Sequence, residues 1–116
     1  MADKKDFCEI ECTNEDVVLK VSARKPPPRL LEEAESLFFV LSDKSRIQIV
    51  QAMKGGQEMC VCDVAAMLST SVAAVSHHLR KMKDLGVLTN RSEGKLVYYS
   101  VRDKRVESLL DVVFAK

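Results

Sequence analysis

The fold is decided by residues 61–85, which read VCDVAAMLSTSVAAVSHHLRKMKDL. Two apolar, helix-forming segments flank a break of three hydroxyl residues at positions 69–71. A serine or threonine in such a break can accept a hydrogen bond from the free backbone N–H groups at the start of the next helix. The stretch therefore predicts one helix over residues 63–68 and a second that starts at Val72. It indicates a helix-turn-helix, although an ordinary helical hairpin would show the same pattern.

The second predicted helix has two distinct faces. Its apolar residues recur at steps of three and four positions, which predicts one buried stripe made of Val72, Val75, Leu79, Met82 and Leu85. Another face is small near its start and polar or basic further along, as expected of a helix that lies in the major groove of DNA. We expect DNA contacts from Ser71, Ala73, Ala74, Ser76, His77 and Arg80.

His78 should lie near the edge of the core, whereas His77 should face DNA. Adjacent side chains on a helix point about 100° apart. For this reason we expect neither histidine to be a primary metal ligand.

A β-hairpin is predicted after the second helix. Gly86 should end that helix, and residues 87–91 and 95–101 have the composition of two strands around a turn at residues 92–94. A two-stranded hairpin is marginal alone, so it must pack on the neighbouring helices. This is the wing of a winged helix, with Arg91 and Lys95 beside its tip. The predicted fold class is mainly α with a small β-hairpin, a winged helix-turn-helix that dimerises.

The rest of the chain divides into an arm and the DNA-binding domain. Residues 1–28 form an N-terminal arm that bears two cysteines, could include a short capped helix from Thr13, and ends in a stiff spacer of three prolines. Residues 29–116 form the DNA-binding and dimerisation domain. Its further helices are marked by apolar residues at helical spacing, namely Leu30, Ala34, Leu37, Phe38 and Leu41, then Ile47, Val50 and Met53 after a cap at residues 42–43, and finally Val106, Leu109, Leu110 and Val113.

The apolar faces of the first and last of these helices allow two interpretations. They could pack in the core of one chain, or they could form a symmetric dimer interface. We favour the interface, because two reading heads must be paired to read a two-fold site in DNA.

Charge and length restrict the function. The 116 residues fit one domain, which is small for an enzyme with its own cleft. The net charge is −3 over residues 1–20 but +5 over residues 69–105, and a basic segment around a candidate reading helix is typical of phosphate contact. Five of the first ten residues are charged and no apolar run reaches membrane-spanning length, so a cytoplasmic protein without a membrane partner is expected.

The four cysteines, Cys8, Cys12, Cys60 and Cys62, indicate metal binding or thiol chemistry, because thiols stay reduced in the cytosol. Two of them could instead be buried packing residues. Nothing in the sequence pairs a cysteine with a histidine base, so we do not expect an enzyme. Residues two apart in a regular helix point about 200° from each other. Cys60 and Cys62 can therefore share an ion only at a helix start or in a distorted helix.

The stretch from residue 41 to residue 99 closely resembles the ArsR/SmtB family of metal-sensing repressors. The resemblance is carried by SHHL at 76–79, by LGVL at 85–88, and by Arg91 followed by Gly94 and the tyrosine pair at 98–99. The CVCD run at 60–63 is similar to the thiolate-sensing members, and the arm with two cysteines to those that sense cadmium and lead. The resemblance implies a homodimeric repressor of a metal-efflux operon that binds double-stranded operator DNA and is released from it when metal binds.

The resemblance also implies where the metal ligands lie. Some arsenic-sensing members have a third cysteine three residues after the pair, but Ala65 stands at that position here. The other ligands would then be Cys8 and Cys12, with the arm of one subunit completing the site of the other. An all-sulfur site favours soft or borderline ions, Cd²⁺, Pb²⁺, Bi³⁺ or Zn²⁺, over Mg²⁺ or Ca²⁺.

Some members of the family have a second metal site between paired C-terminal helices. Asp103 matches its first position, but Arg105 and Lys116 replace its histidines and the final carboxylate position lies beyond residue 116. We expect this site not to function, because an arginine cannot bind a metal ion. A redox regulator that forms disulfides from the four cysteines remains the main alternative to metal sensing, and a metal-buffering protein is a third possibility.

Overall fold

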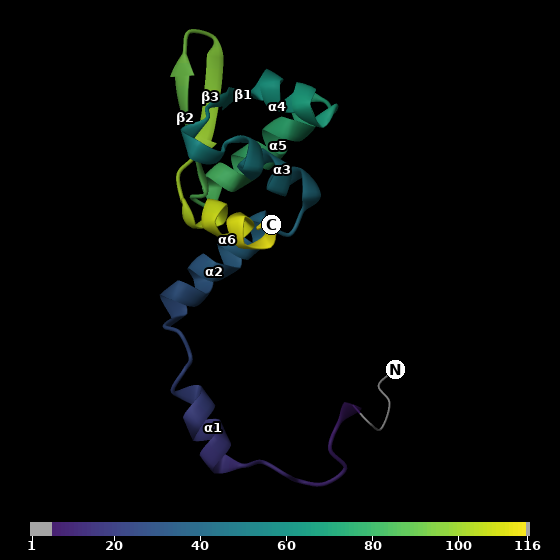
Figure 1. The fold of residues 1–116 in the computed structure, drawn as a ribbon, viewed down its shortest axis with the longest axis vertical. Helices are drawn as coiled ribbons and strands as arrows, with labels where there is room; N and C mark the ends of the chain where they lie inside the picture. The colour runs from purple at the N-terminus through teal and green to yellow at the C-terminus, as the bar shows by residue number, and fades with distance from the viewer. Residues whose placement is uncertain (1–5, 116) are drawn as a thin grey trace. The chain divides into compact units, whose positions relative to one another are not determined.

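The computed structural model describes residues 6–115, which form two units. The first unit extends to Leu31 and the second begins at Glu32. Figure 1 shows the elements in chain order, which are α1 (Glu15–Ser22), α2 (Pro28–Val40), α3 (Lys44–Ala52), the 3₁₀ turn η2 (Lys54–Gly56), β1 (Met59–Cys60), α4 (Val61–Leu68), α5 (Val72–Asp84), β2 (Leu88–Glu93), β3 (Leu96–Val101) and α6 (Arg105–Val113). Of the described helices, none is both long and apolar enough to cross a membrane.

The first unit contains the short capped helix expected from Thr13. The side chain of Asn14 accepts a hydrogen bond from the backbone N–H of Val17 at 3.2 Å, so it caps α1. No residue of α1 is buried. The proline spacer is shorter than expected, because Pro28 is the first residue of α2. Proline suits this position, since the first N–H groups of a helix have no partner within the helix.

The second unit has one hydrophobic core. It is formed by residues of every helix from α2 to α6 together with the strands, and its fully buried members include Val40, Ile49, Val50, Met53, Val64, Val75, Leu79, Met82, Val87, Leu88 and Val106. The predicted stripe of α5 is confirmed at its three central residues, and Leu85 packs against the core while half-buried. The prediction that Val72 is buried was wrong, since its side chain is 49% exposed. It is the first residue of α5, and the core begins one turn further along at Val75.

The wing is confirmed and includes a strand that the sequence did not predict. The sheet order is β1-β3-β2, and all pairs are antiparallel. Glu93 pairs with Leu96, so the turn consists of Gly94 and Lys95 and is one residue shorter than the predicted turn at 92–94, because β2 continues to Glu93. Gly94 has a φ of 59°, which explains why glycine suits this turn. Figure 1 shows the β2–β3 hairpin extending from one end of the unit, beside α4 and α5.

The outer helices α2 and α6 each have apolar residues on two sides. Leu37 and Leu110 lie in the core, whereas Phe38 is 59% exposed and Val113 is 72% exposed. The sequence placed each helix's apolar residues on one face, which could pack in the core or form a dimer interface. The structure divides these faces, because Phe38 and Val113 stay outside the core and Leu30 is also exposed. Neighbouring helical positions point about 100° apart, so Phe38 points away from the side of α2 on which Leu37 enters the core. The exposed residues leave an apolar surface on each helix.

Candidate functional site

The turn between α4 and α5 gives the two helices of the motif their geometry. Ser69 ends α4 in the left-handed conformation, with a φ of 53°. Ser71 precedes α5, and its Oγ accepts a hydrogen bond from the backbone N–H of Ala74 at 3.1 Å. The hydroxyl triplet therefore supplies the helix cap that the sequence predicted. The structure fixes the start of α5, the end that a reading helix presents to base edges.

The face of α5 predicted to contact DNA is open to solvent. Exposed residues on or beside it are Ser71, Ala73, Ala74, His77 and Arg80. Ser76 and His78 are half-buried, and for His78 this agrees with the expected place at the edge of the core. Lys81 and Lys83 add positive charge to the last turn of the helix. The surface combines small residues at the helix start with cations further along, which suits close approach to a groove and contact with phosphates.

The two cations of the wing have different surroundings. Lys95 is exposed in the turn of the hairpin. The Arg91 guanidinium is already hydrogen-bonded to two carboxylates. Its Nε and Nη2 donate to the two carboxylate oxygens of Glu58 at 2.7 and 2.9 Å, and its Nη1 donates to Glu93 at 2.8 Å. These carboxylates raise the pKa of Arg91 above its ordinary value, and the hydrogen bond from Arg91 lowers the pKa of Glu58 below its ordinary value. Arg91 also lies over the ring of Tyr98, 4.9 Å from its centre.

Cys60 and Cys62 lie at a helix start, one of the two geometries expected for a shared ion. Cys60 ends β1 and precedes α4 with an extended backbone, at φ −80° and ψ 164°. Its N–H donates to the carboxylate of Asp63 at 3.2 Å, which holds the chain at this entry to the helix. Cys60 is half-buried and Cys62 is exposed, and both are free thiols. Because Cys60 is not helical, the angle between successive helix positions does not separate the two sulfurs.

Cys8 and Cys12 are exposed free thiols of the first unit. A hydrogen bond between their side chains raises the pKa of Cys12, so the structure brings these two thiols together. Over residues 6–115, no three His, Cys, Asp or Glu side chains gather in an arrangement that could hold a metal ion. The cysteines thus form two pairs in two separately described units.

Comparison with known proteins identifies the family. The sequence pattern described as bacterial regulatory protein, arsR family, matches residues 43–90. A cadmium resistance transcriptional regulatory protein CadC homolog of Staphylococcus aureus is 40% identical over 110 residues, covering 95% of this chain and 90% of the relative. The chain belongs to the arsR family. The CadC protein of Listeria innocua is 37% identical over 107 residues, covering 92% of this chain and 89% of the relative.

The arsR fold is also found among solved structures. A homodimeric winged helix-turn-helix DNA-binding domain from Mycobacterium bovis superposes with a TM-score of 0.64 at 24% identity, covering 77% of this chain and 84% of that domain. The winged-helix architecture predicted from the sequence is therefore confirmed. Proteins of the arsR family regulate transcription by binding DNA, and this chain is a transcriptional repressor of that family and not an enzyme.

An ion pair lies at the position of the second metal site that the resemblance suggested. The Arg105 side chain donates to both carboxylate oxygens of Asp103, at 3.0 Å from Nε and 2.7 Å from Nη2. This contact lowers the pKa of Asp103. Lys116 lies outside the described residues. That this site does not function stays a prediction, and the ion pair gives it a physical reason.

The contact of Glu58 with the wing cation was not predicted from the sequence, and Tyr98 was noted only as part of the family resemblance. A two-residue strand has too few positions to show the alternation that marks a strand. The spacing of Glu58 from Cys60 could have indicated its position. Side chains two positions apart in an extended segment point to the same face of a sheet.

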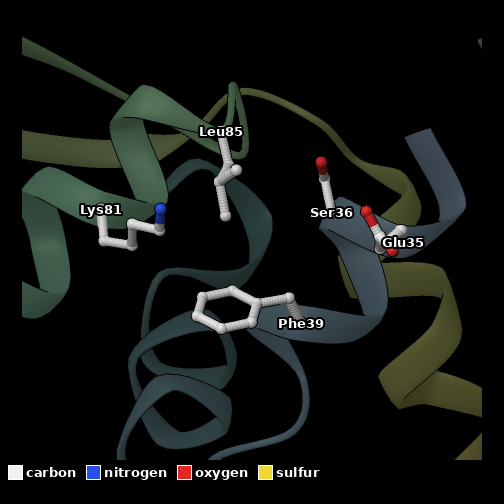
Figure 2. A pocket seen from close by; sticks show the side chains of 5 residues that line it. All are labelled: Glu35, Ser36, Phe39, Lys81 and Leu85. Atoms are coloured by element: carbon white, nitrogen blue, oxygen red, sulfur yellow. The ribbon is translucent and has the colours of Figure 1, made fainter. Parts of the chain in front are cut away.

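A shallow hollow of about 350 Å³ lies elsewhere on the second unit. Figure 2 shows its lining, which consists of Glu35, Ser36 and Phe39 of α2 with Lys81 and Leu85 from α5 and its end. The cation of Lys81 lies 5.7 Å from the centre of the Phe39 ring. The lining has one carboxylate and no thiol or imidazole, so it does not have the donor set of a soft-metal site.

Proposed function

We propose that this protein is a homodimeric repressor of a heavy-metal resistance or efflux operon. It binds operator DNA and dissociates when a soft ion such as Cd²⁺, Pb²⁺, Zn²⁺ or Bi³⁺ binds the thiolates of Cys8, Cys12, Cys60 and Cys62. The observation that carries this proposal is the position of Cys60 and Cys62 at the start of α4, the helix that packs against the reading helix α5.

The DNA-binding half of the proposal is supported by α5 and the wing. The start of α5 presents Ser71, Ala73, Ala74, Ser76 and His77, and Arg80 follows one turn later. Arg91 and Lys95 would contact the phosphates on either side of the groove from the hairpin. Phosphate contacts supply affinity and position, while contacts of α5 with base edges supply specificity.

The metal-binding half is supported by the donor set. One ion could bind the sulfurs of both Cys60 and Cys62 at the start of α4. A trigonal or tetrahedral site needs one or two further ligands. Two further sulfurs would come from Cys8 and Cys12, a hydrogen-bonded pair in the N-terminal arm. The Staphylococcus aureus and Listeria innocua relatives are named as cadmium resistance regulators, which agrees with an all-sulfur site for a soft ion.

Metal binding would reach the DNA surface through α4. Val64 and Ala65 of α4 lie in the same core cluster as Val75 and Leu79 of α5. Gathering both cysteine pairs around one ion would draw the acidic arm to the start of α4, close to a surface that must accept phosphates. Linkage then requires operator DNA to weaken metal binding by the same factor by which metal weakens DNA binding, typically about 1–3 kcal/mol.

The exposed apolar residues of α2 and α6 would form the dimer interface. Val112, Val113 and Phe114 are all more than half exposed at the end of α6, and Phe38 is similarly exposed on α2. The side chains of Arg105 and Glu33 approach to 3.6 Å between α6 and α2. A two-fold dimer through these helices would cover the apolar surface and pair two copies of α5.

The proposal is tested with a duplex selected from a random-sequence library by the metal-free protein. The selected site should be two-fold symmetric, and addition of Cd²⁺ in reducing buffer should release it, with Mg²⁺ as the control. The contact between Cys8 and Cys12 would also suit a disulfide, so a thiol oxidant is added in a parallel, metal-free sample. Release by the oxidant but not by Cd²⁺ would replace metal sensing with redox sensing.

A further inference from the structure

One row of residues crosses the sheet from the thiolate pair to the wing. Cys60 of β1 pairs with Tyr98 of β3, and Tyr98 pairs with Arg91 of β2. Directly paired residues of an antiparallel sheet place their side chains on the same face. The contact between Arg91 and the Tyr98 ring agrees with this geometry. The Cys60 thiol and the Arg91 guanidinium therefore share one face of the sheet, separated by one tyrosine.

Glu58 connects the two ends of this row. It lies two residues before Cys60, between the extended backbone of Gln57 and the start of β1, and both oxygens of its carboxylate accept hydrogen bonds from Arg91. Glu93 takes the third nitrogen of the same guanidinium. All three nitrogen atoms of Arg91 thus donate to carboxylates, so a DNA phosphate must compete with them for this cation.

We propose that Glu58 is a positioning residue, which holds the wing cation Arg91 away from DNA phosphate and links its position to the state of Cys60. This inference rests on the proposed metal-sensing function. An ion bound by several thiolates carries net negative charge, and at Cys60 it would lie on the face of the sheet that holds Arg91. That charge strengthens the retention of Arg91 beside Glu58. In the metal-free protein the two carboxylates and the Tyr98 ring oppose transfer of Arg91 to a phosphate, without the added charge of a bound ion.

The test compares Glu58→Gln, Arg91→Gln and the double variant by fluorescence anisotropy with a generic DNA duplex at several salt concentrations. Asp84→Asn removes the same charge from α5 without touching Arg91 and is the matched control. Glu58→Gln should tighten generic binding about two- to fivefold, the range of an exposed ion pair. The salt dependence should steepen by about one ion, since Arg91 becomes free to contact phosphate. In the Arg91→Gln background, Glu58→Gln should do no more than Asp84→Asn.

The link to metal is measured with the selected duplex and Cd²⁺. Glu58→Gln should lose less DNA affinity on Cd²⁺ addition than the parent, while the cadmium–thiolate absorption stays the same. Circular dichroism confirms that the variants are folded. Equal effects of Glu58→Gln and Asp84→Asn in both backgrounds would overturn the proposal, and an unchanged Cd²⁺ response would overturn its link to Cys60. If Cd²⁺ fails to release the parent, the proposed function fails, and the generic duplex still decides whether Glu58 restrains Arg91.

Discussion

The apolar end of α6 suggests a substitution that should split the proposed dimer without unfolding the chain. Full burial of a valine side chain contributes about 1.5–3 kcal/mol. Val113 is 72% exposed, so its burial in a dimer would contribute about 1–2 kcal/mol per protomer. A two-fold interface contains each substitution twice. Val113→Glu should therefore cost about 2–4 kcal/mol of association, which weakens the dimer about 30- to 1,000-fold.

The assay is sedimentation equilibrium over a range of protein concentrations, with circular dichroism to monitor folding. Gln48→Glu, on the exposed side of α3, adds the same charge away from the apolar surface and should leave the dimer intact. Leu110→Glu provides the opposite control, because Leu110 is 3% exposed and a carboxylate there would be buried in the core and unfold the chain. A folded Val113→Glu variant that dimerises as strongly as the parent would refute the proposed interface.

Three further predictions concern the wing, the fold and the second metal position. Lys95→Gln should lower DNA affinity for all sequences and flatten the salt dependence by about one ion, as measured by anisotropy at several salt concentrations. Asp43→Ala should cost about 1 kcal/mol of stability in denaturant unfolding at neutral pH, because Asp43 accepts the N–H of Arg46 and caps α3. That hydrogen bond lowers the pKa of Asp43, so the stabilisation is present above the ordinary carboxyl pKa, and the difference from the parent should shrink as the pH falls through the lowered pKa. Asp103→Ala should leave Cd²⁺-driven release of DNA unchanged, because Arg105 already takes both oxygens of Asp103.

Most of the fold could be predicted from helical periodicity and from the residue types at turns. The steps of three and four positions located Val75, Leu79 and Met82 in the core, and the hydroxyl triplet located the start of α5 at Ser71. These features are local, so a single sequence contains them. Val72 and Val113 show the limit of the same reasoning, since periodicity gives the face of a residue but not how far along a helix the core extends.

The surroundings of the candidate sites were less accessible from the sequence. One carboxylate on Arg91 comes from Glu93 of the same strand, and the other comes from Glu58, which immediately precedes β1 at the other edge of the sheet. The second contact depends on the register of β1, a strand of two residues. The cysteine pairs were found from residue type and spacing alone. The structure adds that the backbone of Cys60, just before α4, is extended, so the helical angle does not separate its sulfur from that of Cys62.

Cys60 and its partner thiolates are proposed to sense the metal, and one titration tests this role most directly. Cd²⁺ is added in reducing buffer to the parent and to Cys60→Ser, each bound to the labelled selected duplex, while cadmium–thiolate absorption and anisotropy are recorded together. In the parent, absorption and DNA release should saturate at the same metal concentration. Cys60→Ser should lose most of the absorption change and remain on the DNA. Tight Cd²⁺ binding with full DNA release by Cys60→Ser would contradict the account and place the sensing site elsewhere.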